Sequence, residues 1–185
     1  ESGVVCPAAI YIRAAITEPG TVQHKGGPGL VILGKGKGRD AVHPVPLLEL
    51  FELAGIPHEW HEDPFPAIWS KFLLISPFSL VTAVTSKTFG EVMADPRLKS
   101  DLESMIGEVA AVARAKGVEL PPDALAETMK KAANFPPQTK TSFQRDIEAG
   151  KDKDERDIFG GSLIRLGSEL GVRTPVTKRY FAALA

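Results

Sequence analysis

The chain has 185 residues, a formal net charge of −1 and a pI of about 6.5. That length is enough for one hydrophobic core, or for one domain with part of another. The near-neutral charge gives no general electrostatic attraction to nucleic acid or to an anionic membrane, so neither is expected as a partner. The single cysteine, Cys6, excludes an intrachain disulfide and is typical of a cytoplasmic protein.

The first third of the chain predicts short strands. Residues 4–16 are rich in β-branched side chains and predict an extended segment, which Pro7 places at a sheet edge. Further strands are expected at 21–25 and 30–33, separated by turns at 18–20 and 26–29. Residues 46–54 then predict a short amphipathic helix that ends at Gly55. Because residue 1 is not Met and this opening lacks a signal-peptide pattern, we expect a piece of a longer protein.

Two motifs in this part suggest sites that their details do not support. Gly29 to Lys35 fits G-x-x-x-x-G-K, but Gly36 follows where a phosphate-binding loop needs Ser or Thr. A solvated turn is the better interpretation. His58 and His61 lack the spacing of a helical zinc motif, and in an extended segment they would lie on opposite faces. No metal site is therefore expected.

Residues 65–85 form the most apolar stretch, and Lys71 is its only charged residue. Lys71, Ile75 and Ser79 recur every fourth residue, so they share one face of a predicted helix that Pro77 would kink. The lysine can be read in two ways: as a snorkelling side chain with its ammonium in water, or as a desolvated functional amine. A membrane span has the right length, but the internal lysine and proline and the lack of flanking basic clusters argue against it.

Helices are predicted over most of the remaining sequence, and Asp63 to Pro66 marks the change from strands. The expected helices cover residues 96–116, from Pro121-Pro122 through 133, and 141–149, the last capped by Thr141 or Ser142. The cluster at 151–157 precedes another helix whose buried face would contain Ile158, Phe159, Leu163, Leu166 and Leu170. A last helix starts at Thr174-Pro175. No serine or cysteine hydrolase motif is present.

An ordered set of segments across nearly the whole chain resembles the ketopantoate reductase (2-dehydropantoate 2-reductase) family. Each motif is weak by itself, and their order and separations carry the resemblance. The segments are 18–20 (Glu-Pro-Gly) with a histidine soon after, 54–56 (Ala-Gly-Ile), 68–72 (Ile-Trp-Ser-Lys-Phe), 107–113 (Gly-Glu-Val-Ala-Ala-Val-Ala), 142–147 (Ser-Phe-Gln-Arg-Asp-Ile), 154–161 (Asp-Glu-Arg-Asp-Ile-Phe-Gly-Gly) and 171–175 (Gly-Val-Arg-Thr-Pro).

The resemblance implies a mostly α fold with a small β portion. Residues 1–63 would be the last strands of a Rossmann-type NADPH-binding domain. Residues 64–185 would form an all-helical domain, like the C-terminal domain of 6-phosphogluconate dehydrogenase, which binds substrate and can form a homodimer. The family's G-x-G-x-x-G is absent from this sequence. The implied activity of the parent is reduction of ketopantoate in pantothenate and coenzyme A biosynthesis, with NADPH bound mainly outside this chain.

The resemblance also assigns site residues. Lys71 falls on the general acid that protonates the 2-oxo oxygen, and Ser142 falls on the serine that binds the substrate, although it could equally be a helix cap. The family's glutamate, which pairs with the lysine and reaches cofactor or substrate, aligns with Asp154, and Glu155 is the chemical match one residue later.

Two substrate-side positions depart from the family pattern. Ile75 and Ser79 stand where ketopantoate reductases usually carry asparagines. Loss of an amide removes a hydrogen bond to the substrate and changes specificity. Two alternatives therefore stay open: a reductase of a different 2-oxo acid, and a helical dimerisation module without catalysis.

Overall fold

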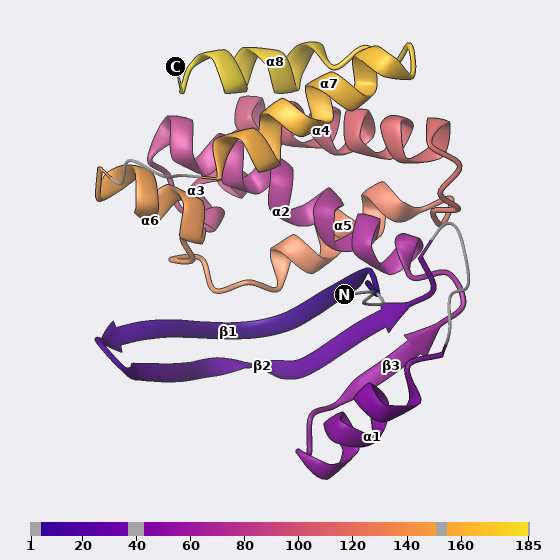
Figure 1. The fold of residues 1–185 in the computed structure, drawn as a ribbon. Coiled ribbons are helices and arrows are strands. Elements are labelled where there is room, and N and C mark those ends of the chain that lie inside the picture. The colour runs from indigo at the N-terminus through magenta and orange to yellow at the C-terminus, as the bar shows by residue number, and fades with distance from the viewer. Residues whose placement is uncertain (1–4, 37–42, 151–154, 185) are drawn as a thin grey trace. The chain divides into compact units, whose positions relative to one another are not determined.

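The computed structural model describes residues 5–36, 43–150 and 155–184. Strands occupy the first part and helices the rest, as the sequence predicts (Figure 1). The chain divides into two compact units, Glu1–Ile68 and Trp69–Ala185. This division falls a few residues after the predicted domain limit at residue 63, within the helix that carries Lys71.

The first unit contains a three-stranded sheet with the order β1-β2-β3. Strands β1 (Ala8–Glu18) and β2 (Thr21–Gly34) form an antiparallel hairpin, and β3 (His58–His61) pairs with the end of β2 in parallel. Helix α1 (Val45–Leu53) supplies the connection between β2 and β3, and Gly55 follows its end with a φ of 64°. A parallel neighbour needs such a crossover.

The prediction of two short strands separated by a turn at residues 26–29 is wrong. These residues lie inside one continuous strand, β2. Between the pairs Arg13–Gly26 and Tyr11–Leu30, four steps along β2 oppose two along β1, so the glycine-rich segment is a bulge. Gly26 and Gly27 have φ angles of 108° and 91°, which let the strand absorb the extra residues and stay paired.

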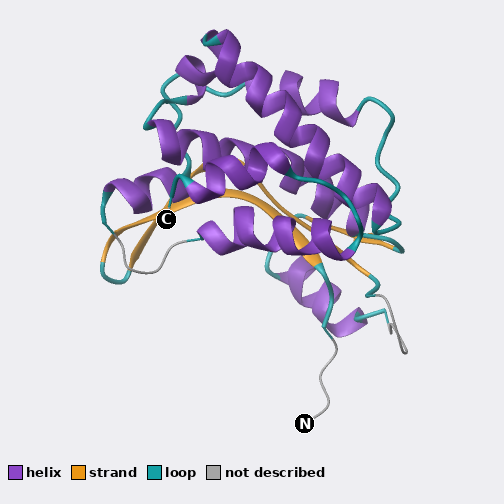
Figure 2. Ribbon diagram, turned by 90° about the horizontal axis from the view of Figure 1, so that it is seen from above, coloured by secondary structure: helices purple, strands orange, loops and turns teal. Residues whose placement is uncertain are grey.

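The second unit consists of helices in its described part (Figure 2). Helices α2, α4, α5, α6, α7 and α8 lie on predicted segments, and α3, which was not predicted, begins with a capping box between Thr88 and Glu91. The helices are α2 (Phe65–Thr85), α3 (Phe89–Ala94), α4 (Pro96–Ala115), α5 (Ala124–Ala133), α6 (Ser142–Glu148), the π-helix η1 (Asp157–Gly161), α7 (Ser162–Glu169) and α8 (Pro175–Ala182).

Helices α2 and α4 provide most of the core of this unit. Phe78 and Leu80 of α2 are fully buried, as are Leu102, Met105 and Ile106 of α4. Helix α2 is long and apolar enough to cross a membrane by length and composition, but 56% of its apolar window is buried inside the structure. The central helix of a folded domain shows such burial, and this agrees with the sequence-based argument against a membrane span.

The predicted buried face of the helix after residue 157 is partly wrong. Phe159 and Leu163 are buried as expected, but Ile158 and Leu170 are 56% and 36% exposed. The segment begins as a π-helix and continues as α7, so the extra residue in its first turn changes the angular phase of the side chains. A regular period of 3.6 residues therefore cannot describe this face.

Candidate active site

Lys71 lies in the second turn of α2 and is half-buried. Burial lowers the pKa of its ammonium below the ordinary lysine value, because removal of water disfavours the charged form. Half-burial fits both interpretations of this lysine, a packed stem with a hydrated ammonium and a desolvated functional amine. Ile75, also half-buried, and Ser79, only 3% exposed, lie on the same helical face at four-residue intervals.

Ser142 is the first residue of α6, and its side chain is exposed. The cap of this helix is Thr141, whose hydroxyl accepts a hydrogen bond from the backbone N–H of Gln144 at 3.1 Å. Thr141, and not Ser142, is therefore the cap of this helix. Thr141 Oγ1 also lies 3.1 Å from Thr82 Oγ1, and this hydrogen bond fixes the beginning of α6 against α2.

The segment with the predicted acids leads into η1, which is attached to the same helix. The Ser76 hydroxyl of α2 donates a 2.7 Å hydrogen bond to the carbonyl oxygen of Phe159, and both groups are buried. The Phe159 ring also packs edge-on against Phe143 of α6, with ring centroids 5.5 Å apart. Glu155, half-buried, lies one turn before Phe159, since its carbonyl accepts from the Phe159 N–H at 3.0 Å. Asp154 lies outside the described residues.

Helix α2 thus brings together the three segments that the sequence singles out. Between Lys71 and Thr82, α2 carries the amine, the Ser76 hydroxyl that bonds to η1 and the Thr82 hydroxyl that bonds to the start of α6. π-Helical turns are frequent at functional sites, because they redirect a backbone carbonyl and the side chains around it. A half-buried amine on this helix is suited to protonate an oxygen that gains negative charge.

The residues that make these attachments were not identified from the sequence. Ser76 and Thr82 are small polar residues in an apolar helix, where a hydroxyl commonly bonds to its own helix. Thr82 does so, at 2.8 Å from the Phe78 carbonyl, and also reaches Thr141. The sequence does not show which side of α2 meets α6 and η1. Only the tertiary contacts show that Ser76 and Thr82 lie on that side.

The histidines of β3 do not approach each other in a way that suggests a site. His61 Nε2 lies 3.0 Å from a carboxylate oxygen of Glu59, and His58 Nδ1 lies 2.9 Å from the carbonyl oxygen of Ile56. Among the described residues, no three His, Cys, Asp or Glu side chains are grouped so that they could hold a metal ion. Of the Gly-Lys segment at 34–38, residues 37 and 38 lie outside the described ranges.

Comparison with known proteins identifies the helical part. The model of the ketopantoate reductase PanE/ApbA C-terminal domain matches residues 65–185. The chain belongs to the ketopantoate reductase family. That match begins at the first residue of α2, so the whole lysine helix, α6 and η1 lie inside the family's C-terminal domain.

The proteins that this chain resembles are distant from it in sequence. An uncharacterized oxidoreductase of Bacillus subtilis is 25% identical over 94% of this chain, and a 2-dehydropantoate 2-reductase of Pyrobaculum aerophilum is 30% identical over 73%. The crystal structure of a PanE/ApbA family ketopantoate reductase from Ralstonia eutropha superposes with a TM-score of 0.85 at 27% identity, covering 97% of this chain.

The chain spans about half the length of these relatives. It covers 57% of the Bacillus subtilis protein, 48% of the Pyrobaculum aerophilum protein and 57% of the Ralstonia eutropha structure. A D-mandelate dehydrogenase with bound NADH shares the fold, with a TM-score of 0.80 at 19% identity.

Proposed function

We propose that this chain is the substrate-binding and proton-donating part of an NAD(P)H-dependent 2-oxo acid reductase. The observation that carries the proposal is the half-buried Lys71, with its lowered pKa, on a helix to which α6 and η1 are both hydrogen-bonded. The family match over residues 65–185 supports the same assignment.

In this proposal Lys71 protonates the 2-oxo oxygen of the substrate as the carbon that bears this oxygen is reduced. The ammonium stabilises the negative charge that develops on the oxygen and then delivers a proton to it, effects that contribute roughly 10²–10⁴-fold to the rate. The exposed Ser142 hydroxyl is the proposed hydrogen-bonding partner of the substrate. Glu155 and Asp154 are the proposed acids that pair with the lysine and reach cofactor or substrate.

The residues present do not fit a complete dinucleotide site. The sequence holds no G-x-G-x-x-G, the glycine-rich turn that places a pyrophosphate at a helix N-terminus. We therefore propose that the cofactor, NADPH or NADH, is held mainly by parts of a longer protein. The 185-residue chain by itself is expected neither to bind NADPH tightly nor to turn over, and ordinary reductase activity of this chain would overturn the division of roles.

Replacing Lys71 in the longer protein tests the catalytic assignment. We expect Lys71→Ala to lower kcat/KM for the best 2-oxo acid by about 10²–10⁴-fold, the range for loss of a general acid. Lys99→Ala is the matched control, since Lys99 is an exposed lysine of α4. Unchanged turnover in Lys71→Ala, with a folded variant, would remove the lysine from the mechanism.

The substrate is proposed as a 2-oxo acid whose identity Ile75 and Ser79 help to set. Ile75 has no hydrogen-bonding group, and Ser79 is almost fully buried, so the lysine face presents few polar partners to a substrate hydroxyl. Ketopantoate, phenylglyoxylate and branched-chain 2-oxo acids form the discriminating panel. The highest kcat/KM for ketopantoate would support the pantothenate role, and a preference for an apolar 2-oxo acid would support the alternative.

A helical dimerisation module without catalysis is the second candidate, favoured by the same lack of polar groups at Ile75. A ketopantoate reductase from Staphylococcus aureus with this fold is dimeric. The module would leave turnover of the longer protein unaffected by Lys71→Ala while changes on its helical surface alter the molecular mass in solution. The reductase proposal requires instead that Lys71→Ala lowers the turnover of the longer protein.

A further inference from the structure

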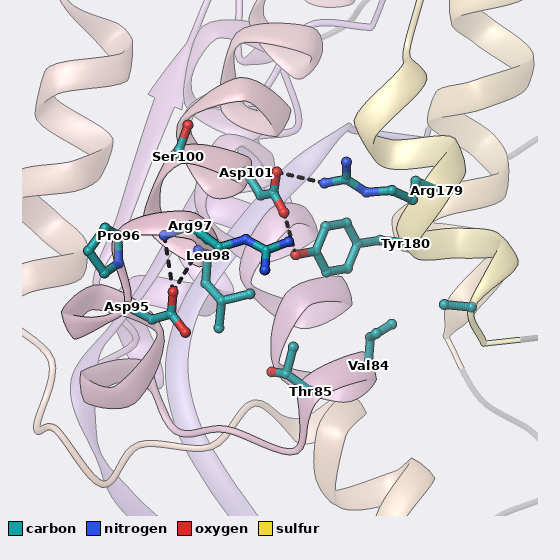
Figure 3. A pocket seen from close by; sticks show the side chains of 11 residues that line it. Val84, Thr85, Asp95, Pro96, Arg97, Leu98, Ser100, Asp101, Arg179 and Tyr180 are labelled. Atoms are coloured by element: carbon teal, nitrogen blue, oxygen red, sulfur yellow. Dashed lines mark hydrogen bonds and ion pairs between the residues drawn. The ribbon is translucent and has the colours of Figure 1, made fainter.

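A cavity of about 690 Å³ lies in the helical unit, away from the lysine face. It is formed by the end of α2, the beginning of α4 and the α8 helix, as Figure 3 shows. Lys71 and Thr85 are fourteen residues apart on α2, a separation of about 21 Å at the helical rise. The cavity is therefore separate from the candidate active site, and its volume is in the range of small-molecule sites.

Both carboxylates at this cavity are occupied by groups of the protein itself. Asp101 lies 2.6 Å from the Arg179 guanidinium and accepts a 2.8 Å hydrogen bond from the Tyr180 hydroxyl. Asp95 caps α4 by accepting hydrogen bonds from the backbone N–H groups of Arg97 and Leu98. Its other oxygen lies 4.0 Å from the Lys87 ammonium. These acids are thus not available as ligands for a cation.

Of the two arginines that line the cavity, Arg97 is the one whose guanidinium can pair with a ligand. It makes no ion pair with any residue in the described part of the chain, whereas Arg179 is already paired with Asp101. In Figure 3 the Arg97 side chain extends from α4 toward Tyr180, across the cavity wall. A guanidinium in this position can form two parallel hydrogen bonds to a planar carboxylate.

The rest of the wall is apolar in large part. Val84 at the end of α2, Leu98 on α4 and Ala183 after α8 contribute hydrocarbon surface opposite or beside the charged groups. Apolar walls with a few placed polar groups are the usual composition of a small-molecule site. We propose that this cavity binds a small organic carboxylate with an apolar body, its carboxylate paired with Arg97 and its body against Val84, Leu98 and Ala183.

An NMR titration of the 185-residue chain with 3-phenylpropionate tests the proposal. We expect saturable shifts of the backbone amide signals of Leu98, Asp101 and Ala183. Arg97→Gln should weaken the affinity about tenfold or more, because a charge-assisted pair is lost. The neutral isostere 3-phenylpropanamide should bind the wild-type chain correspondingly weakly.

Lys99→Gln is the matched control, an exposed cation of the same helix that does not line the cavity. It should bind 3-phenylpropionate as the wild-type chain does. Arg97 is exposed, so Arg97→Gln should unfold at the wild-type temperature, and thermal unfolding verifies this. Equal affinity for the amide, an unaltered affinity in Arg97→Gln, or shifts that do not saturate or lie outside the cavity would each overturn the proposal.

Discussion

Lys71 is the residue on which the proposed chemistry depends, and it is half-buried in α2. Burial lowers its pKa, since removal of water disfavours the charged ammonium. A group whose pKa is lowered by folding stabilises the folded state above its unfolded pKa of 10.5, and this contribution is lost as the pH falls through the folded value.

The prediction is that Lys71 titrates below the ordinary lysine value. Reductive methylation with ¹³C-formaldehyde, followed by NMR titration, measures each dimethyl-lysine separately. The Lys71 signal should move at a lower pH than the ordinary lysine value of 10.5, and Lys71→Arg assigns it. Titration of Lys71 at the ordinary lysine value would show that its amine is hydrated.

The pKa of Tyr180 is also shifted, but upward, so its effect on the pH dependence of stability is opposite to that of Lys71. Burial, followed by its hydrogen bond to Asp101, raises its pKa from 10.0 to about 12. A raised pKa means that the stabilising contribution is complete below pH 10.0 and is lost as the pH rises to about 12.

Tyr180→Phe tests this contribution. The difference in free energy of unfolding between wild type and Tyr180→Phe, measured with urea, should shrink between pH 10.0 and about 12. Comparing the two proteins cancels the titration of lysines that they share. A difference that is constant over this range would mean that the tyrosine hydroxyl is not held by Asp101 in solution.

At the scale of elements, α8 is attached to α4 by a carboxylate at its N-terminus. Glu108 of α4 accepts hydrogen bonds from the backbone N–H groups of Val176 and Thr177, at 2.8 and 2.9 Å, and from the Thr177 hydroxyl at 2.6 Å. An acid from one helix thus supplies the cap that Thr174 does not provide for α8. A negative charge at a helix N-terminus also interacts favourably with the helix dipole.

Glu108→Ala is expected to lower the free energy of unfolding by about 3 kcal/mol, because it removes charged hydrogen bonds and leaves donors of a buried threonine without a partner. Urea unfolding gives the change. Glu103→Ala, on the same helix and without a hydrogen bond or ion pair in the described structure, should change stability by no more than about 0.5 kcal/mol. Equal effects of the two variants would contradict the capping role.

At the scale of the whole molecule, the described part of the first unit exposes more large apolar side chains than that of the second. Alternate residues of β1, including Ile10, Ile12 and Ile16, are exposed, and Ile16 is paired across the hairpin with Val22. Ile16 and Val22 are 77% and 67% exposed. Continuous exposed apolar surface favours association in water.

We therefore predict that Ile16→Thr combined with Val22→Thr reduces self-association of the 185-residue chain. Threonine keeps the β-branched side chain that suits a strand, so the free energy of unfolding should stay within about 0.5 kcal/mol of wild type. Sedimentation velocity over a range of concentrations measures the association. Ala15→Thr, on the other face of β1, serves as control, and equal behaviour of both variants would contradict the prediction.

The sequence by itself determined the strand-then-helix order, the extent of α2 and α4, and the family resemblance at Lys71 and Ser142. These features depend on local signals, namely apolar periodicity, helix-terminal prolines and glycines, and motif order. The sequence did not determine how far Lys71 is buried, because its burial depends on residues distant in the chain. The continuous β2, the π-helical start of the segment after Glu155 and the bonds from Ser76 and Thr82 were decided only by tertiary structure. The bulge in β2 depends on its pairing with β1, and the hydroxyls of Ser76 and Thr82 bond to segments that lie far apart in the sequence.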